Sequence, residues 1–318
     1  MTVFNELSEK VFLNMKKIYI TGMQGFVGGI LKDFIEREYK QGVVLELSEE
    51  FVDIRDRAAL DKAFSRTLPD WVIHLAAISH VPDSFKNPRL TYDTNFLGTL
   101  NLLEALRDAG FKGRFLYVGS SDEYGLANAE SLPLKETSPL RPRSPYAVSK
   151  LAAEAMCYQW SVSEEMDIMM ARPFIHIGPG QSDSFVMSNF ARQIVEAEAG
   201  RSDGVIRVGN IDITRDFTDA RDTARAYILL MEKGSKGETY NVCSGVERSL
   251  RDMLTMLLEA SDADIRIEKD PSRMRKTDQK RMVGSNEKIR AHLNWEPRIN
   301  IKSTLMELIE YWRKKSNE

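Results

Sequence analysis

The chain has 318 residues, of which 42% are hydrophobic and 29% charged, and its formal net charge is −3. A chain of this length can bury a large core, and this composition excludes the disordered, collagen-like and membrane-embedded classes. Because the net charge is small, there is no strong field to attract nucleic acid or an anionic membrane, and we expect neither as a partner.

The N-terminal residues and the cysteines bear on location and on metal binding. Residues 1–14 contain Glu6 and Glu9 and lead into no long apolar run, so we expect an extension outside the core fold rather than a secretory signal. Cys157 and Cys243 lack the spacing of a disulfide framework or a zinc site, so we expect two buried thiols and no metal. The sequence therefore predicts a cytoplasmic protein.

Short apolar runs alternate with amphipathic stretches from Lys17 onward, a pattern typical of a parallel sheet covered by helices. The expected strands are Ile18–Thr21, Val43–Leu47, Trp71–Leu75, Phe115–Gly119 and Ile168–Ala171. The expected helices are Phe26–Tyr39, Ala58–Phe64 with Asp56 as its cap, Thr91–Ala109 and Ala147–Glu165. We predict an α/β, Rossmann-type doubly wound sheet that forms a dinucleotide-binding domain over residues 15–172.

The pattern changes after Pro173, where Gly178-Pro179-Gly180 interrupts it. The helices expected beyond this point are Phe185–Ala199 and Leu250–Ala260. We predict a smaller C-terminal α/β region over residues 173–318 that binds substrate. Tyr240–Val242 has the composition of a strand, and its return to the main sheet stays open.

A glycine-rich turn lies between the first strand and the first helix. Gly22 can supply the tight turn, Gly25 the close approach of a pyrophosphate, and Gly28 the close packing of helix and strand. The helix N-terminus offers free N–H groups to phosphates. This context predicts a dinucleotide site, with a turn that binds no ligand as the alternative.

The most specific chemical signal is a Tyr-x-x-x-Lys pair on a predicted helix, preceded by a serine at a strand end. Tyr146 and Lys150 lie one helical turn apart, and Ser120 follows the fourth predicted strand. An ammonium favours a nearby phenolate, so we expect Lys150 to lower the pKa of Tyr146 from about 10 toward neutrality. The three residues predict hydride chemistry at an alcohol or ketone, with Tyr146 exchanging the proton and Ser120 binding the oxygen.

The glycine spacing and the Ser, Tyr and Lys motifs together resemble the extended short-chain dehydrogenase/reductase family. The resemblance implies NADPH or NADH as cofactor, a homodimer through Thr91–Ala109 and Ala147–Glu165, and His74 lining the cofactor pocket through its backbone. The cofactor contacts that it implies are Gly22, Gln24, Gly25, Phe26, Val27, Gly28, Asp53, Ile54, Leu75, Ala76, Ala77, Asn95, Tyr146, Lys150 and Pro173.

An acidic residue about 20 positions after the glycines binds the ribose 2′-hydroxyl in NAD enzymes. Glu46 lies near this distance, followed by Glu49 and Glu50, and no Arg follows the strand directly. The pattern favours NADH over NADPH, while solvent-exposed glutamates remain an equal alternative.

The later motifs are similar to the GDP-mannose branch of that family. The substrate contacts implied are Ser79, Asp122, Ile175, Val186, Arg215, Arg275 and Asp278. Arg215 is expected to bind the diphosphate, because a guanidinium matches phosphate oxygens. Ile175 stands where the branch usually has Asn and cannot form a hydrogen bond through its side chain, so either the activity or the accepted sugar should differ.

The resemblance implies reduction of the C4 ketone of GDP-4-dehydro-6-deoxy-D-mannose to GDP-D-rhamnose. A 4,6-dehydratase or a 4-epimerase is the first alternative, although Asp122 alone is a thin supply of acid and base for an elimination. A non-catalytic NAD(P)-binding sensor or scaffold is the second, and it generally loses the Tyr or the Lys that this chain keeps.

Overall fold

The structure is a computed structural model that describes residues 16–38, 43–45, 52–274 and 279–317. The chain forms two compact units. Among the described residues, the first unit comprises those within 1–123, 144–172 and 224–240, and the second comprises those within 124–143, 173–223 and 241–318. Residues 1–14, predicted to be an extension, lie outside the described residues.

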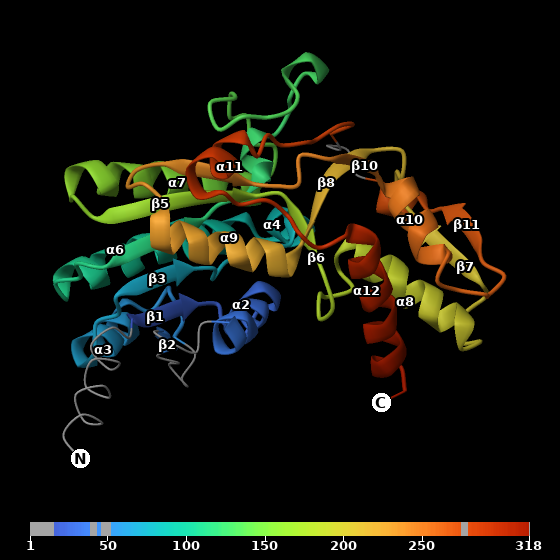
Figure 1. The fold of residues 1–318 in the computed structure, drawn as a ribbon, viewed down its shortest axis with the longest axis horizontal. Coiled ribbons are helices and arrows are strands. Elements are labelled where there is room, and N and C mark those ends of the chain that lie inside the picture. The colour runs from blue at the N-terminus through green and yellow to red at the C-terminus, as the bar shows by residue number, and fades with distance from the viewer. Residues whose placement is uncertain (1–15, 39–42, 46–51, 275–278, 318) are drawn as a thin grey trace. The chain divides into compact units, whose positions relative to one another are not determined.

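The first unit is built around a six-stranded sheet in the order β2-β1-β3-β4-β5-β9 (Figure 1). Its strands are β1 (Lys16–Thr21), β2 (Val43–Leu45), β3 (Trp71–His74), β4 (Arg114–Val118), β5 (Asp167–Pro173) and β9 (Thr239–Val242). Its helices and turns are α2 (Phe26–Glu38), α3 (Arg57–Arg66), α4 (Val81–Lys86), α5 (Pro88–Tyr92), η1 (Asp93–Leu97), α6 (Gly98–Asp108), η2 (Ser121–Tyr124), α7 (Pro145–Ser163) and α9 (Ala220–Lys233), whose first turn belongs to the second unit. The β1 to β5 pairings are parallel, which confirms the predicted α/β Rossmann-type fold.

Helices bury this sheet because its strands are apolar at consecutive positions. All four residues of β3 are buried, so both of its faces are covered. One face contributes Val72, Phe115, Tyr117 and Ile168 to a cluster with side chains of α3, α6 and α7. This packing holds the carboxyl ends of β1, β3 and β4 in register, and these are the ends at which a Rossmann fold binds its ligand.

One predicted helix is interrupted. The sequence predicted a single helix over Thr91–Ala109, but the structure has α5, a π-helical turn η1 and then α6. Asn95 lies in the π-helical turn and bonds through its side chain to Ile78 and Ser149. A π-helical turn accommodates an extra residue and often occurs at a functional site.

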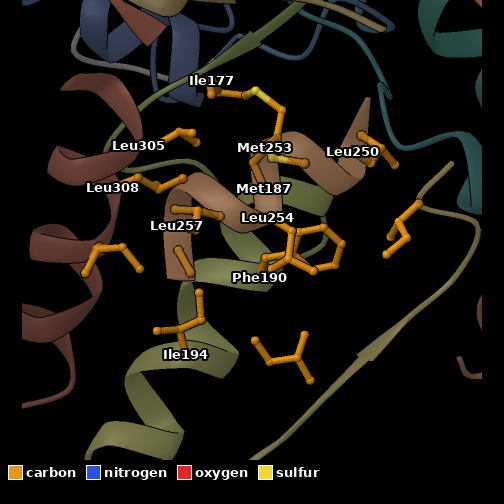
Figure 2. Close-up of a cluster of buried hydrophobic side chains, with 14 of the residues drawn as sticks. Ile177, Met187, Phe190, Ile194, Leu250, Met253, Leu254, Leu257, Leu305 and Leu308 are labelled. Carbon is orange, nitrogen blue, oxygen red and sulfur yellow. The ribbon is translucent and has the colours of Figure 1, made fainter. Parts of the chain in front are cut away.

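The second unit has two small sheets, β10-β8-β6 and β11-β7. Its strands are β6 (Ile175–Ile177), β7 (Val205–Val208), β8 (Thr214–Asp219), β10 (Glu247–Ser249) and β11 (Arg266–Lys269). Its helices and turns are η3 (Ala129–Ser131), α8 (Val186–Glu198), α10 (Leu250–Leu258), η4 (Pro271–Arg273), α11 (Glu287–Leu293) and α12 (Ile301–Lys315). Apolar side chains of α8, α10 and α12 form its core, as Figure 2 shows for Phe190, Leu254 and Leu308.

Two segments fall on the other side of the predicted division at residue 173. Residues 224–240 belong to the first unit, where β9 extends the main sheet beside β5, so Tyr240–Val242 does return to that sheet. Residues 124–143 belong to the second unit, where Leu134 exchanges backbone hydrogen bonds with Val283 and Ser285. No spacing pattern in the sequence signals either long-range pairing.

Candidate active site

The turn between β1 and α2 requires glycine because chain segments pack closely against each other there. Gly22 has a positive φ of +71°, and a Cβ there would lie 2.8 Å from the backbone nitrogen of Ala76. A Cβ on Gly28 would lie 2.5 Å from the Gly22 carbonyl oxygen. Helix α2 starts at Phe26 and has no acidic residue in its first turn, so no carboxylate opposes an anion at its N-terminus. These features fit the pyrophosphate of a dinucleotide.

His74, the last residue of β3, supports the loop that follows the strand. Its Nδ1 lies 2.7 Å from the hydroxyl of Thr21 and its Nε2 lies 2.9 Å from that of Thr99. The Thr21 hydroxyl accepts the N–H of Ala76, so these hydrogen bonds connect His74 to the loop after β3, which is predicted to bind the cofactor. Burial and then the charge of Lys150 lower the pKa of His74 to about 3, so the ring is neutral and acts as a support.

The predicted adenosine end is only partly described. Both carboxylate oxygens of Asp53 accept a hydrogen bond from Nε of Arg55, each at 3.0 Å. The hydrogen bond from Arg55 lowers the pKa of this carboxyl group. Ile54 is buried against Gly98. Glu46, Glu49 and Glu50 lie outside the described residues.

The structure brings the three predicted catalytic residues together. Ser120 follows β4, and its side chain is hydrogen-bonded to the hydroxyl of Tyr146 on α7. One turn further along α7, the ammonium of Lys150 donates to the carbonyl oxygen of Val118 at 2.6 Å. All three side chains are buried. The arrangement places a phenol, a hydroxyl and an ammonium at the carboxyl end of the central strand.

Local sequence fixes where α7 begins, and therefore which way Tyr146 and Lys150 face. Ser144 is the N-cap, and its hydroxyl accepts the N–H of Ala147 at 3.1 Å. Pro145 occupies the first turn, where its missing N–H costs nothing. The pair thus lies on the side of α7 that is buried in the first unit.

The expected effect of Lys150 on the Tyr146 phenol is wrong for this structure. Burial raises the pKa of Tyr146, the negative charge of Asp122 raises it further, and the hydrogen bond with Ser120 opposes both. Lys150 is instead bound to the Val118 carbonyl, and burial lowers its own pKa to about 8. At neutral pH the phenol is therefore protonated and the lysine is mainly charged.

Asn95, predicted as a cofactor contact, has its side chain committed to protein groups. Its amide accepts the N–H of Ile78 at 2.8 Å, and donates to the Ile78 carbonyl and the Ser149 hydroxyl, both at 3.0 Å. The Ser149 hydroxyl in turn donates to the backbone carbonyl of Tyr146. Asn95 therefore ties the loop after β3 to the start of α7.

The sequence reasoning missed a buried charged cluster beside Ser120. Glu123 accepts the backbone N–H of Ser120, and Arg172 pairs with Glu154 on α7. The only sequence signal is two consecutive acidic residues, Asp122 and Glu123, in a strand-end motif where charge usually reaches solvent. The structure assigns them opposite environments, since Glu123 is buried and Asp122 is half-buried.

The predicted substrate residues are distributed over both units. Ser79 is exposed on the loop after β3 in the first unit, and the backbone N–H of Asp122 donates to the Ser120 hydroxyl. In the second unit Ile175 lies in β6, Val186 starts α8, and Arg215 on β8 donates to the carbonyl oxygens of Thr214 and Gln279. The predicted cofactor contact Pro173 ends β5, and Arg275 and Asp278 lie outside the described residues.

Within the described residues there is no cluster of three His, Cys, Asp or Glu side chains that could hold a metal ion. The helices of that same part of the chain include none long and apolar enough to cross a bilayer. Both cysteines are buried free thiols.

A family model described as GDP-mannose 4,6 dehydratase matches residues 46–308. The chain belongs to the GDP-mannose 4,6-dehydratase family. The resemblance to extended short-chain dehydrogenases/reductases is thereby confirmed. The matched residues span both units and include Ser120, Tyr146 and Lys150, predicted to be catalytic, and the second-unit residues predicted for the substrate.

Members of this family differ in the reaction they catalyse, and three comparisons show which members this chain is similar to. GDP-6-deoxy-D-mannose reductase of Pseudomonas aeruginosa is 40% identical over 303 residues, which cover 95% of this chain and 99% of that protein. A GDP-mannose 4,6-dehydratase of Yersinia enterocolitica is 27% identical and covers 93% of each chain. The structure of RMD from P. aeruginosa complexed with NADPH matches with a TM-score of 0.90 and 40% identity, over 94% of this chain and 99% of that one.

Proposed function

We propose that the chain reduces the C4 ketone of GDP-4-dehydro-6-deoxy-D-mannose to GDP-D-rhamnose, with NADPH or NADH as hydride donor. The observation that carries the proposal is the Ser120–Tyr146–Lys150 arrangement, in a chain 40% identical over almost its whole length to a GDP-6-deoxy-D-mannose reductase. The protein is thus an oxidoreductase of nucleotide-sugar metabolism.

The protonation state of Tyr146 favours reduction. A bound nicotinamide would supply the hydride for C4. Because burial and Asp122 raise the pKa of Tyr146, its phenol holds the proton that the C4 oxygen needs. Ser120 donates a hydrogen bond to that oxygen and stabilises the charge that develops on it. The product alcohol contains the hydride on carbon and the proton of Tyr146 on oxygen.

The first unit supplies the residues for the dinucleotide. The glycine turn would hold the pyrophosphate, Asp53 and Ile54 the adenosine side, and Lys150 the nicotinamide ribose. Ala76 and its neighbours would line the floor of the site, since the Gly22 backbone approaches them so closely. The P. aeruginosa relative in complex with NADPH supports the phosphorylated cofactor, whereas the glutamates after β2 favour NADH.

The second unit supplies the residues for the GDP-sugar in this proposal. Arg215 would bind the diphosphate, and Val186 and Ile175 would face the nucleotide and the sugar. Ser79, Asp122, Arg275 and Asp278 complete the predicted set. The apolar Ile175 predicts a sugar position held by fewer hydrogen bonds than in family members with Asn there.

The decisive experiment is a stoichiometric assay. Purified protein with NADPH or NADH and GDP-4-dehydro-6-deoxy-D-mannose should consume one reduced cofactor per sugar, and NMR should identify GDP-D-rhamnose. GDP-mannose without added cofactor should remain unchanged. Its conversion to a 4-keto sugar would select a dehydratase, while interconversion of C4 epimers without cofactor consumption would select an epimerase.

A homodimer is part of the proposal. Trp160 on α7 is buried in the core, whereas Tyr158 and Val162 on the same helix are exposed. Tyr92 and Leu97 add exposed apolar surface on α5 and η1, which pack against α7. Exposed apolar groups gathered on neighbouring helices are typical of an interface. Light scattering should give twice the chain mass, and Val162→Glu should halve it; a monomeric wild type would contradict the dimer.

We also propose a cytoplasmic location. Two free buried thiols and no disulfide among the described residues suit a reducing compartment. Cell fractionation should recover the protein with cytosolic markers; recovery with membranes would contradict this.

A further inference from the structure

Three charged side chains lie almost completely buried beside the catalytic serine. Glu123 is 0% exposed, Arg172 4% and Glu154 5%. The Arg172 guanidinium donates to both carboxylate oxygens of Glu154, at 2.9 and 2.5 Å. Its Nε also lies 3.3 Å from Oε2 of Glu123. One cation therefore faces two carboxyl groups in a dry environment.

The environment of Glu123 favours its protonated form. Among the described residues its Oε2 has no hydrogen-bond partner, although it is buried and lies 3.3 Å from Nε of Arg172. Burial raises the pKa of Glu123 well above its usual range, and the charge of Glu154 adds to this. Arg172 and the N–H of Ser120 oppose this rise in pKa, but the arginine is already hydrogen-bonded to Glu154. One proton on Glu123 leaves the cluster neutral.

Glu123 also holds the turn that carries Ser120. Its Oε1 accepts the backbone N–H of Ser120 at 2.8 Å, and its own N–H donates to the Ser120 carbonyl at 3.1 Å. Gly119 precedes the serine, and a Cβ there would lie 2.4 Å from Oε1 of Glu123. The carboxyl therefore lies directly against the backbone of the turn and clamps Ser120 in two places.

We propose that Glu123 is a positioning residue that orients Ser120 toward the carbonyl oxygen of the substrate. The inference rests on the proposed function and adds to it a residue that never touches the sugar. A buried ionisable cluster costs more to form than an apolar side chain of similar volume. A leucine in place of Glu123 would have a lower free-energy cost of burial, but it would leave the Ser120 N–H without an acceptor.

The test compares two variants of nearly equal size. Glu123→Gln keeps an acceptor for Ser120 and carries no charge, so it mimics the protonated carboxyl. Glu123→Leu keeps the volume and removes the acceptor. The glutamine variant should retain kcat within a few-fold, and the leucine variant should lose about 10- to 100-fold in kcat, the scale of a misplaced oxyanion donor, with cofactor affinity unchanged.

A double-mutant cycle separates positioning from plain structural support. If Glu123 acts through Ser120, Glu123→Leu should cost little kcat when Ser120 is already alanine. Additive losses, or a leucine variant with wild-type kcat, would overturn the inference. The Gln variant should also keep the pH profile of kcat. If Glu123 were ionised, its loss would remove a charge that raises the pKa of Lys150, and the basic limb would move to lower pH.

A measurement without substrate keeps this inference distinct from the proposed reaction. Amide hydrogen exchange at Ser120 should be at least about tenfold faster in Glu123→Leu than in Glu123→Gln, while exchange within β4 stays equal in both. Equal exchange at Ser120 would contradict the clamp even if the enzyme proves to be a reductase. A protected Ser120 in a protein that does not reduce the sugar would overturn the proposed function alone.

Discussion

The two units both bury carboxyl groups, but they satisfy them in different ways. In the second unit Asp222 accepts the backbone N–H groups of Arg298 and Ile299, at 2.9 and 2.8 Å, so one carboxylate joins distant chain segments. In the first unit Glu123 and Glu154 lie against each other and Arg172. Backbone donors hold the Asp222 carboxylate in place, whereas burial and the neighbouring Glu154 raise the pKa of Glu123. The ionisable cluster lies beside the predicted catalytic residues.

The apolar cores differ in the same sense. The cluster in Figure 2 joins α8, α10 and α12 through aliphatic and aromatic side chains, and its central members are fully buried. The carboxyl end of the first unit's sheet instead buries His74, Ser120 and Lys150. The comparison predicts that substitutions near the predicted catalytic residues change chemistry while the fold survives, and that substitutions in the second-unit core do the opposite.

The largest expected effect is the loss of the phenol. Tyr146→Phe should lower kcat by about 10²- to 10⁴-fold, because the proton donor is removed. Thermal unfolding and cofactor binding should stay near those of the wild type, since one hydroxyl is lost from a site that keeps its packing. Steady-state kinetics and a cofactor titration check this. A variant with wild-type turnover would support a non-catalytic, cofactor-binding protein.

The corresponding change in the second unit targets stability. Leu308 on α12 is fully buried in the apolar cluster, so Leu308→Ala should lower the free energy of unfolding by about 2–5 kcal/mol. Urea titration measures the loss, and kcat per folded molecule should be nearly unchanged. A fall in kcat as large as that of Tyr146→Phe, at conditions where the variant is folded, would break the comparison.

A smaller effect is expected at the glycine turn, where the chain provides its own control. A Cβ on Gly28 would lie 2.5 Å from backbone atoms of Gly22 and Met23, whereas a Cβ on Gly29 would have nothing within 4 Å. Gly28→Ala should weaken cofactor binding and cost about 1–3 kcal/mol in stability. Gly29→Ala, in the same helix, should be neutral or stabilise by up to about 1 kcal/mol. Equal effects of the two substitutions would argue against close packing of Gly28 on the backbone of the turn.

The smallest effect concerns pH. Burial lowers the pKa of Lys150 to about 8, so kcat/KM should fall as the pH rises through this value and the ammonium loses its proton. The charged and titratable groups facing Lys150 are His74, Glu123 and Cys157, and His74 is neutral throughout this range. Lys150→Arg should keep a charge and move the limb upward, even if kcat is reduced. If the basic limb of the pH profile stays near pH 8 in this variant, a group other than Lys150 causes it.

The candidate site could be predicted where spacing alone defines geometry. Gly22, Gly25 and Gly28 lie between a strand and a helix, and Tyr146 and Lys150 are one turn apart on a helix, so local periodicity was sufficient. The pKa of Tyr146 could not be predicted in this way. It depends on burial and on Asp122, which lies far from Tyr146 in the sequence, and the expected effect of Lys150 was wrong because its ammonium is bound to the Val118 carbonyl.

The sequence by itself determined the α/β sheet and the glycine turn, and it predicted Ser120, Tyr146 and Lys150 as catalytic residues, because each follows from residue types at short, regular spacing. Only the tertiary structure decided that Asn95 lies in a π-helical turn bonded to Ser149, that β9 returns to the main sheet, and that Glu123 is buried against Glu154 and Arg172. These features join segments far apart in the chain. Their energies depend on burial and on mutual contact, which no local pattern of residues encodes.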